Sequence, residues 1–500
     1  DATKNRYFKI QPGSSGVAPS TSAYHADNVR KRKAEDRRSS AARKRQELLK
    51  NHIKRTTCLN APLTGGRLRR ELHGGFDPEI AVESWVNGLR PKGEASFTTN
   101  HTPSPGFDMG AFHVQGRDDV SGMGMIYARM LLVASYVPTT EDGHISYDSD
   151  PLRRRSRSQE IHYEPLFVDA ITSMNYHAPT NQLLLTSSLT DMGAGGFLDD
   201  PAIAHEPEPS TMPKWLLGET DNFQLCRFNG PLTVYSARLA PSSSILSAVL
   251  ATDRGICKMD ETEHAEPVEW LGSPKKYGGW GPVSMWDVLS VDWHPTNSAL
   301  IYGGTRDGRL LHIDLRLHGT QIRDYGHTSS VAHIRAINEH QLLAAGPRSA
   351  MAVYDLRWMR QQPRHLHNHN HNQNHGNAQK QAAQTVPVVQ MQGYSNAAHV
   401  NIGLDVVHLS GHGGGGGGGG VVAAGMDDGS VGVFSLQTGR KWKMDGVDSR
   451  AKLGLSQGSV VKTVQWHKMP REQDPSLWVS ARSAVKKFSF GLGVDEEGDC

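Results

Sequence analysis

The sequence has few cysteines. Its 500 residues contain four, and these are widely scattered at Cys58, Cys226, Cys257 and Cys500. No Cys-x-x-Cys pair is present, which argues against a disulfide framework and against a cysteine-based zinc site. We therefore expect reduced thiols in an intracellular protein.

Long apolar runs are also absent. No stretch approaches the roughly 20 apolar residues that a membrane-spanning helix needs, and the first residues lack the charged-then-apolar pattern of a secretory signal. The chain opens with Asp1 and not with Met, which is consistent with a start that lies before residue 1. The sequon Asn100-His101-Thr102 is expected to carry no glycan, because glycosylation requires the secretory route.

Motifs of common enzyme classes are missing as well. The sequence contains neither H-E-x-x-H nor a Walker loop. Gly454–Gly458 matches G-x-S-x-G, but a nucleophile elbow needs a helix after the serine, and the strand-like VVKTVQW follows instead. The run Gly413–Gly420 matches G-x-G-x-x-G only trivially, because no helix follows it to bind a phosphate. We predict a protein that is not an enzyme and needs no cofactor.

A histidine-rich segment, HLHNHNHNQNH, is the one candidate for metal binding. Its histidines are His365, His367, His369, His371 and His375. Imidazoles at alternating positions can converge on a divalent ion. The intervening Asn and Gln residues, with no ordered element expected on either side, favour a low-complexity loop with adventitious metal affinity. No functional metal site is predicted.

Charge is unevenly distributed, although the formal net charge is only +3. Between Arg30 and Arg70, fifteen Lys and Arg residues are accompanied only by Glu35, Asp36 and Glu47. Residues 26–54 are strong helix formers without Gly or Pro, which predicts one or two basic helices. These helices have too few apolar residues to form a core of their own. A basic N-terminal arm therefore precedes a mildly acidic body.

The tetrapeptide Arg30-Lys31-Arg32-Lys33 has three interpretations. It can be a nuclear-import signal, a nucleic-acid contact, or part of a solvated helix face. No aromatic residues are interleaved with it, so the stacking of single-stranded bases is not supported. We expect an intracellular location, nuclear and also cytoplasmic.

From about residue 110 the chain consists of short apolar strands separated by turns. Two units contain the turns Asp307-Gly308 and Asp428-Gly429, where a tight hairpin favours glycine because the backbone needs a positive φ. Seven such units follow one another, and two of them carry insertions between their strands. They span residues 125–147, 171–228, 233–259, 288–316, 330–358, 401–436 and 460–490.

Units of roughly 40 residues with this plan are typical of a β-propeller with four strands per blade. The plan resembles the WD40 family. Only the fifth unit opens with a clear Gly-His pair, Gly326-His327, and no unit ends in a literal Trp-Asp. Ile313 and Tyr354 occupy the usual Trp position, so we expect the Trp-centred hydrogen-bond network to be incomplete.

We therefore predict an all-β, WD40-type β-propeller of seven blades with a basic, partly helical N-terminal extension. The extension is assigned to residues 1–109, the propeller to 110–492 and an acidic tail to 493–500. Low-complexity insertions are expected at 361–385 and 411–420. Such insertions are tolerated because the entropy cost of closing a loop grows only slowly with its length.

Two triplets recur in consecutive units. Asp314-Leu315-Arg316 and Asp355-Leu356-Arg357 lie 41 positions apart, and each closes an alternating strand. At such a strand end the aspartate can accept backbone N–H bonds from the turn, and the leucine points into the blade. Each arginine is expected at the rim of one propeller face. One such arginine can be a solvated charge, whereas a pair suits a carbonyl-rich partner surface.

WD40 proteins with Asp-x-Arg boxes in adjacent blades resemble the substrate receptors of cullin-4 RING ubiquitin ligases. The resemblance rests on Ile313–Arg316 and Tyr354–Arg357. It implies that Arg316 and Arg357 contact the ligase adaptor, which is the large subunit of the damaged-DNA-binding protein. It also implies that Asp314 and Asp355 brace the turns, and that the opposite face receives the substrate protein. A helix from residues 41–54 would enter the adaptor's cleft.

An alternative from another functional class stays open. A nuclear propeller scaffold could bind nucleic acid or ribonucleoprotein through its basic N-terminal arm. Its binding should fall steeply with salt, because phosphate contacts release counterions. Binding by the paired arginines should tolerate salt better.

Overall fold

The computed structural model describes part of the chain. Its described residues are 26–50, 78–96, 109–116, 121–128, 131–140, 143–146, 163–167, 170–177, 179, 182–187, 195–198, 223–226, 232–241, 246–260, 268–271, 287–317, 322–359, 385–409, 420–469 and 472–490. They divide into two units, and Pro78 begins the second.

The strands of the second unit form seven four-stranded antiparallel sheets, which we number as blades 1 to 7. Blade 1 contains β2 (Ala111–Gln115), β3 (Ser121–Ala128), β4 (Leu131–Pro138) and β5 (Tyr163–Phe167). Blade 2 contains β6 (Ile171–His177), β7 (Gln182–Ser187), β8 (Gly195–Leu198) and β9 (Phe223–Cys226). Blade 3 contains β10 (Val234–Leu239), β11 (Ser247–Thr252), β12 (Gly255–Asp260) and β13 (Val268–Leu271).

The remaining blades follow the same order along the chain. Blade 4 contains β14 (Val288–Trp293), β15 (Leu300–Thr305), β16 (Arg309–Asp314) and β17 (Ile322–Gly326). Blade 5 contains β18 (His333–Ala336), β19 (Gln341–Gly346), β20 (Ala350–Asp355) and β21 (Val389–Gln390). Blade 6 contains β22 (Leu404–His408), β23 (Gly420–Gly425), β24 (Val431–Ser435) and β25 (Lys441–Trp442). Blade 7 contains β26 (Val464–His467), β27 (Ser476–Ala481), β28 (Ala484–Ser489) and β1 (Arg90–Ser96).

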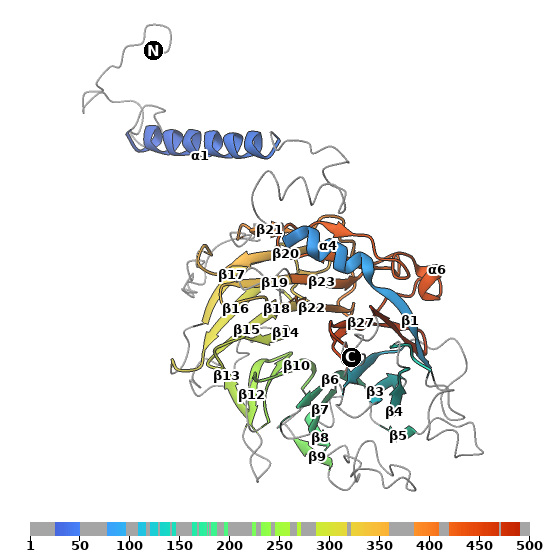
Figure 1. The fold of residues 1–500 in the computed structure, drawn as a ribbon. Coiled ribbons are helices and arrows are strands. Elements are labelled where there is room, and N and C mark those ends of the chain that lie inside the picture. The colour runs from blue at the N-terminus through green and yellow to red at the C-terminus, as the bar shows by residue number, and fades with distance from the viewer. Residues whose placement is uncertain are drawn as a thin grey trace, which may run out of the picture. The chain divides into compact units, whose positions relative to one another are not determined.

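The first strands of the blades are arranged as a ring (Figure 1). Strand β2 contacts β6 and β26, β6 contacts β10, β10 contacts β14, β14 contacts β18, and β22 contacts β26. Blades 5 and 6 share an apolar cluster that includes Leu343, Met351, Leu404 and Val422. The all-β propeller fold predicted from the sequence is therefore confirmed.

Strand β1 closes the ring from the N-terminal side. It pairs antiparallel with β28, so a segment that precedes blade 1 supplies the outermost strand of blade 7. Before it, α4 (Pro78–Gly88) buries Val82 and Val86 in the cluster that contains Trp442 and Phe488 of the last two blades. The structure thus places the propeller boundary near residue 78, earlier than the expected 109/110. The strand was missed because RPKGEAS has no alternating apolar pattern.

Residues 26–50 form a separate helical element. Helix α1 (Ala26–Lys50) lies in the segment for which a basic helix was expected. The expected insertions at 361–385 and 411–420 and the tail at 493–500 lie outside the described residues, apart from Thr385 and Gly420.

Two hairpins follow the turn chemistry expected from the sequence. Gly308 connects β15 to β16 with a φ of 88°, and Gly429 connects β23 to β24 with a φ of 76°. Residues with a side chain rarely adopt these angles, so glycine is required at both turns. The turns fix the position at which the third strand of each blade begins.

Candidate functional site

The two Asp-Leu-Arg triplets occupy equivalent places in neighbouring blades. Each follows the third strand of its sheet, β16 in blade 4 and β20 in blade 5. The blades have the same orientation, because Ser290 and Asp292 on β14 accept the amides of Ile334 and Ala336 on β18. From the first hydrogen bond to the second, the acceptor on β14 and the donor on β18 both move two residues forward along the chain, so the two strands are parallel. Both triplets therefore lie at the same edge of the propeller.

The backbone of each triplet forms the same turn. The amide of Leu317 donates to Asp314 O at 3.2 Å, and that of Trp358 donates to Asp355 O at 3.1 Å. Within each turn the aspartate carboxylate accepts the amide of the arginine two residues later, at 3.0 Å in both cases. The aspartates therefore lie where the sequence analysis expected them to brace the turns.

Each arginine also folds back onto its own aspartate. Arg316 Nε and Nη2 donate to the two oxygens of Asp314 at 2.9 and 2.7 Å. Arg357 makes the same pair of bonds with Asp355, at 3.0 and 2.6 Å. The Arg316 guanidinium lowers the pKa of Asp314 to about 2, and Arg357 likewise lowers the pKa of Asp355.

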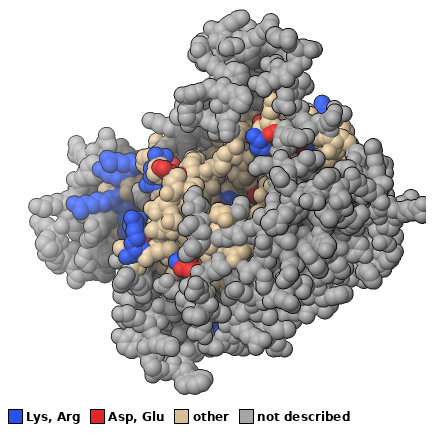
Figure 2. All heavy atoms as spheres, turned by 60° about the horizontal axis from the view of Figure 1, so that its bottom comes forward, with Lys and Arg blue, Asp and Glu red and all other residues tan. Residues whose placement is uncertain are grey.

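This pairing changes what the arginines can offer to a partner. A guanidinium has five N–H donors, and two of them are occupied by the aspartate in each turn. The other donors remain available on side chains that are 65% exposed for Arg316 and 59% exposed for Arg357. Figure 2 shows one face of the molecule, on which acidic side chains lie beside basic ones. Each turn thus presents a pre-oriented, partly neutralised cation.

Exposed apolar side chains accompany the triplets, and the sequence analysis did not identify them. Leu317 is 47% exposed and Trp358 is 79% exposed, and each directly follows its arginine. Val386 and Val388, which are 71% and 52% exposed, precede β21 in blade 5. Their position after an identical triplet is the signal that could have identified Leu317 and Trp358.

The residues at the usual Trp position are buried. Ile313 is 6% exposed and packs in the apolar cluster between blades 3 and 4. Tyr354 is fully buried, and its hydroxyl lies 2.7 Å from His327 Nδ1. The side chain of Ile313 has no hydrogen-bonding group, so it only packs in the apolar cluster. In blade 5 the hydroxyl of Tyr354 takes the place of the tryptophan N–H.

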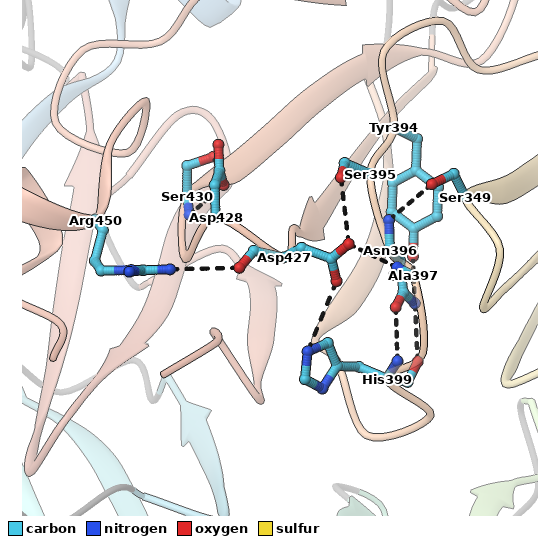
Figure 3. Close-up of polar contacts among 10 residues, drawn as sticks. All are labelled: Ser349, Tyr394, Ser395, Asn396, Ala397, His399, Asp427, Asp428, Ser430 and Arg450. Carbon is cyan, nitrogen blue, oxygen red and sulfur yellow. Dashed lines mark hydrogen bonds and ion pairs between the residues drawn. The ribbon is translucent and has the colours of Figure 1, made fainter. Parts of the chain in front are cut away.

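The opposite edge of blades 5 and 6 carries a polar cluster around Asp427, which lies between β23 and β24 (Figure 3). Asp427 Oδ2 accepts the amide of Ala397 at 2.6 Å and the hydroxyl of Ser395 at 3.3 Å. His399 Nε2 lies 3.7 Å from Asp427 Oδ1. The buried Asn396 side chain donates to His399 O at 2.8 Å, which holds the same loop.

This cluster does not have the order of a nucleophile, a base and an orienting acid. A catalytic serine must bond to its base, but Ser395 donates to Asp427 itself. The neighbouring turn of blade 5 has left-handed backbone at Arg348 and Ser349, with φ of 59° and 54°. Their amides donate to the same loop, at Ala397 O and Asn396 O. The cluster therefore braces a strained edge that presents Arg348 to solvent.

Helix α1 carries the other predicted site. Arg30, Lys31, Arg32 and Lys33 are all exposed on it. The histidines between His365 and His375 lie outside the described residues.

Other sequence motifs have local structural roles. Gly454 is the C-cap of α6 (Arg450–Leu453), with a φ of 74°, and strand β26 follows Ser456 of the G-x-S-x-G match. Cys257 is buried as a free thiol, and burial raises its pKa to about 12. In the described part of the chain, no helix is long and apolar enough to cross a membrane. Among the same residues, no three His, Cys, Asp or Glu side chains are grouped to hold a metal ion.

Comparison with known proteins finds similarity to solved structures. No family model matches the chain, and no curated protein matches its sequence. The chain is similar to the β-propeller domain of Myceliophteria thermophila Cps50 (Swd1), with 14% identity and a TM-score of 0.45, over 79% of this chain and 99% of that one. It is also similar to the computationally designed protein Ika8, with 13% identity and a TM-score of 0.36, over 80% of this chain and 96% of that one. The fold assignment rests on the seven sheets themselves.

Proposed function

We propose that this chain is a substrate receptor of a cullin-4 RING ubiquitin ligase. In this role it docks on the ligase adaptor, the large subunit of the damaged-DNA-binding protein, and presents a bound protein for ubiquitylation. The chain itself supplies proximity, and the recruited enzymes perform the chemistry. The observation that carries the proposal is the pair of identical turns that present Arg316 and Arg357 at one edge of adjacent blades.

The composition of this edge supports protein docking. Tryptophan and arginine are enriched among interface residues whose truncation costs most binding energy. Here the exposed Trp358 directly follows Arg357, and Leu317 directly follows Arg316. Each arginine is already held by its aspartate, so binding needs to order fewer rotamers. Its free N–H groups suit carbonyl or carboxylate oxygens of the adaptor.

The resemblance to cullin-4 receptors extends to one member of that group. The segment Arg6-Tyr7-Phe8 before a basic helix is similar to the N-terminus of cullin-4-associated factor four. In this proposal residues 41–54 supply a helical element for the adaptor's cleft. The exposed Arg30–Lys33 would direct nuclear import. The edge with Arg348 would then face the substrate.

A second candidate function rests on helix α1. Its exposed Arg30–Lys33 tetrapeptide favours a nuclear scaffold that binds nucleic acid or ribonucleoprotein. The two proposals make opposite demands on the chain. The receptor requires the paired arginines, whereas the scaffold requires the basic helix and should lose affinity steeply as salt rises.

A binding measurement between the full chain and the purified adaptor tests the receptor. We expect wild type to bind, and Arg316→Ala and Arg357→Ala each to weaken binding by about tenfold or more, which is the range of an interface hot spot. The double variant should abolish binding. Arg357→Lys tests the planar fork, since a lysine cannot make the bidentate pair with Asp355. Arg348→Ala, at the other end of β20, is the matched control and should bind like wild type.

Two results would overturn the receptor proposal. One is the absence of adaptor binding by a wild-type chain with the circular dichroism of a folded β protein. The other is binding that is indifferent to both arginines. Loss of RNA binding on replacing Arg30–Lys33 by glutamine, with no adaptor binding, would favour the nuclear scaffold.

A further inference from the structure

Helix α1 is not held by an apolar face. Its side chains at residues 30–40 are all exposed, and these residues make about three turns, so every side of the helix is represented. Most of the stability of a helix in a protein comes from packing one face against other elements. Because these turns bury no face among the described residues, opening them disrupts no packed core. The cost of opening them is therefore low.

Two adjacent serines, Ser39 and Ser40, form the weakest point of these turns. Serine has a lower helix propensity than the arginine, lysine and alanine residues around it. The Ser39 hydroxyl also donates to Asp36 O at 3.0 Å, a carbonyl in the preceding turn of the same helix. A serine bonded back to a carbonyl in this way slightly weakens the helix and often bends it. The helix should therefore open first around Ser39 and Ser40.

Arg37 and Arg38 directly precede the two serines. Both arginines are exposed, and neither forms an ion pair among the described residues. Ser40 has Arg37 three positions before it and Arg38 two positions before it. Ser39 differs, because the residue three positions before it is Asp36. Among the serines that the structure describes, only Ser40 has a cation at both positions.

This charge pattern suits one class of enzyme. Arginine-directed protein kinases carry carboxylates beside the active site, and a carboxylate accepts charge-assisted hydrogen bonds from a guanidinium. Such charge patterns are one way in which kinases select their substrates. A kinase binds the residues around its target serine in an extended form, so a firmly packed helix would resist it. The low cost of opening α1 at Ser39 and Ser40 removes that obstacle.

We propose that Ser40 is the phosphorylation site of an arginine-directed protein kinase. In this reaction Ser40 Oγ attacks the γ-phosphorus of ATP, and the bond between that phosphorus and the β,γ-bridging oxygen breaks. ADP leaves, and the hydroxyl proton passes to the catalytic aspartate of the kinase. Arg37 and Arg38 bind the carboxylates of the kinase and so position the hydroxyl. The site belongs to α1 and does not depend on the docking edge of the propeller.

Phosphorylation reduces the positive charge of α1. The helix contains ten Lys and Arg residues and four Asp and Glu residues. A phosphoserine adds about −1.5 to −2 charges at pH 7, which cancels roughly a third of this excess. Asp36 lies four residues before Ser40, so the phosphate also meets a like charge one turn away. The modified helix should therefore bind polyanions more weakly.

Treatment of the full chain with ATP and the catalytic subunit of cAMP-dependent protein kinase, an arginine-directed enzyme, tests the site. A second arginine-rich segment, RRRSRS at residues 153–158, lies outside the described residues, so the experiment uses a chain with Ser156→Ala and Ser158→Ala. We expect mass spectrometry to find one phosphate within α1, on Ser40. The further change Ser40→Ala should remove this phosphate, and Ser39→Ala should keep it.

Matched arginine variants test the role of the two charges. Arg37→Gln with Arg38→Gln should slow phosphorylation by about tenfold or more, because the charge-assisted bonds to the kinase are lost. Arg30→Gln with Arg32→Gln removes the same charge from the same helix. This control should change the rate by less than about twofold, because both charges lie beyond the screening length of about 10 Å from Ser40.

The change in charge has a readout of its own. The phosphorylated chain should elute from a heparin column at lower salt than the unmodified chain, because the helix offers less positive charge to an anionic polymer. The Ser40→Ala chain treated with the kinase is the control and should elute like the untreated chain.

Three results would overturn the site. They are the absence of phosphate within α1, phosphate on Ser39 in place of Ser40, and equal rates for the two double arginine variants. An elution salt that phosphorylation of Ser40 leaves unchanged would overturn the weaker binding of polyanions.

Discussion

His327 and Tyr354 meet through a hydrogen bond of 2.7 Å between His327 Nδ1 and the Tyr354 hydroxyl, across 27 positions of sequence. Their rings also contact edge to face, with centroids 5.7 Å apart. The histidine opens the repeat of blade 5 and the tyrosine lies on its third strand, directly before Asp355. This bond therefore connects the start of the repeat to the strand that presents the Asp-Leu-Arg turn.

Replacing Tyr354 by phenylalanine should destabilise the propeller by about 1–3 kcal/mol, because a buried His327 nitrogen loses its partner. Tyr302→Phe is the matched control. Tyr302 is also fully buried, in the same apolar cluster, and its hydroxyl has no partner in the described part of the chain. Its removal should be neutral or slightly stabilising. Urea denaturation measures both, and equal costs for the two variants would contradict the assignment.

Replacing Lys487, which forms an ion pair with Glu472, should cost much more stability than replacing Lys486, its neighbour on β28. Lys487 Nζ lies 2.7 Å from Glu472 Oε1, with both side chains almost fully buried, and donates to Gly143 O of the blade 1 region at 2.9 Å. Lys487→Met should cost about 3–5 kcal/mol, because it leaves a buried carboxylate uncompensated. Lys486, whose ion pair with Glu94 is long and partly exposed, should tolerate methionine at a cost of about 1 kcal/mol or less.

A double variant identifies the cause of that loss. Adding Glu472→Gln to Lys487→Met removes the unpaired charge and keeps an oxygen for the Ser476 hydroxyl, which now donates to Glu472 at 2.6 Å. Much of the stability should return. If the double variant is as unstable as the single one, packing and not charge is the cause.

The stability of the propeller should fall as the pH drops below about 6.5. Burial lowers the pKa of His113 and His333 to about 3, and that of His327 and His467 to about 4. The unfolded chain then binds more protons than the folded one over this interval, so acid favours unfolding. At pH 5.5 each histidine should cost about 1.4 kcal/mol. Asp405, whose pKa is raised, offsets part of this loss.

Denaturation curves at pH 7.5 and 5.5 measure the dependence of the free energy of unfolding on pH. His333→Gln should flatten it, since the variant removes one of the groups that resists protonation in the folded state. A free energy of unfolding that does not change between these two pH values would contradict the prediction.

The closing strand makes a prediction about chain length. A chain that begins at Pro78 keeps α4 and β1, and it should unfold at nearly the same temperature as the full chain, because α1 belongs to the other unit. A chain that begins at residue 97 leaves the edge of β28 unpaired and removes Val82 and Val86 from their apolar cluster. It should unfold well below the full chain or aggregate. Thermal scans of the three chains distinguish these outcomes.

The sequence indicated most of the propeller because strand alternation and hairpin glycines are local signals. The turns at Gly308 and Gly429 and the ends of β16 and β20 lie where these signals placed them. Strand β1 could not be predicted in the same way. Its partner β28 lies almost 400 residues away, and the pairing depends on the closed ring and not on the pattern of residues 90–96.

The candidate site was predictable in part for the same reason. The triplets are sequence patterns, and their exposed arginines and bracing aspartates follow from strand periodicity. The paired hydrogen bonds of Arg316 with Asp314 and of Arg357 with Asp355 could not be predicted, because they depend on side-chain conformations that the sequence does not specify.

Trp358 offers the sharpest test of the docking edge. It is 79% exposed, so its replacement by alanine should leave the free energy of unfolding within about 0.5 kcal/mol of wild type, as for other surface substitutions. If the edge binds the adaptor, the same change should weaken binding by about tenfold or more, because a tryptophan at the centre of an interface contributes strongly. Val386→Ala, also in blade 5, is the matched control for a smaller exposed apolar group. Adaptor binding that survives Trp358→Ala but not Arg357→Ala would restrict the interface to the arginine turns.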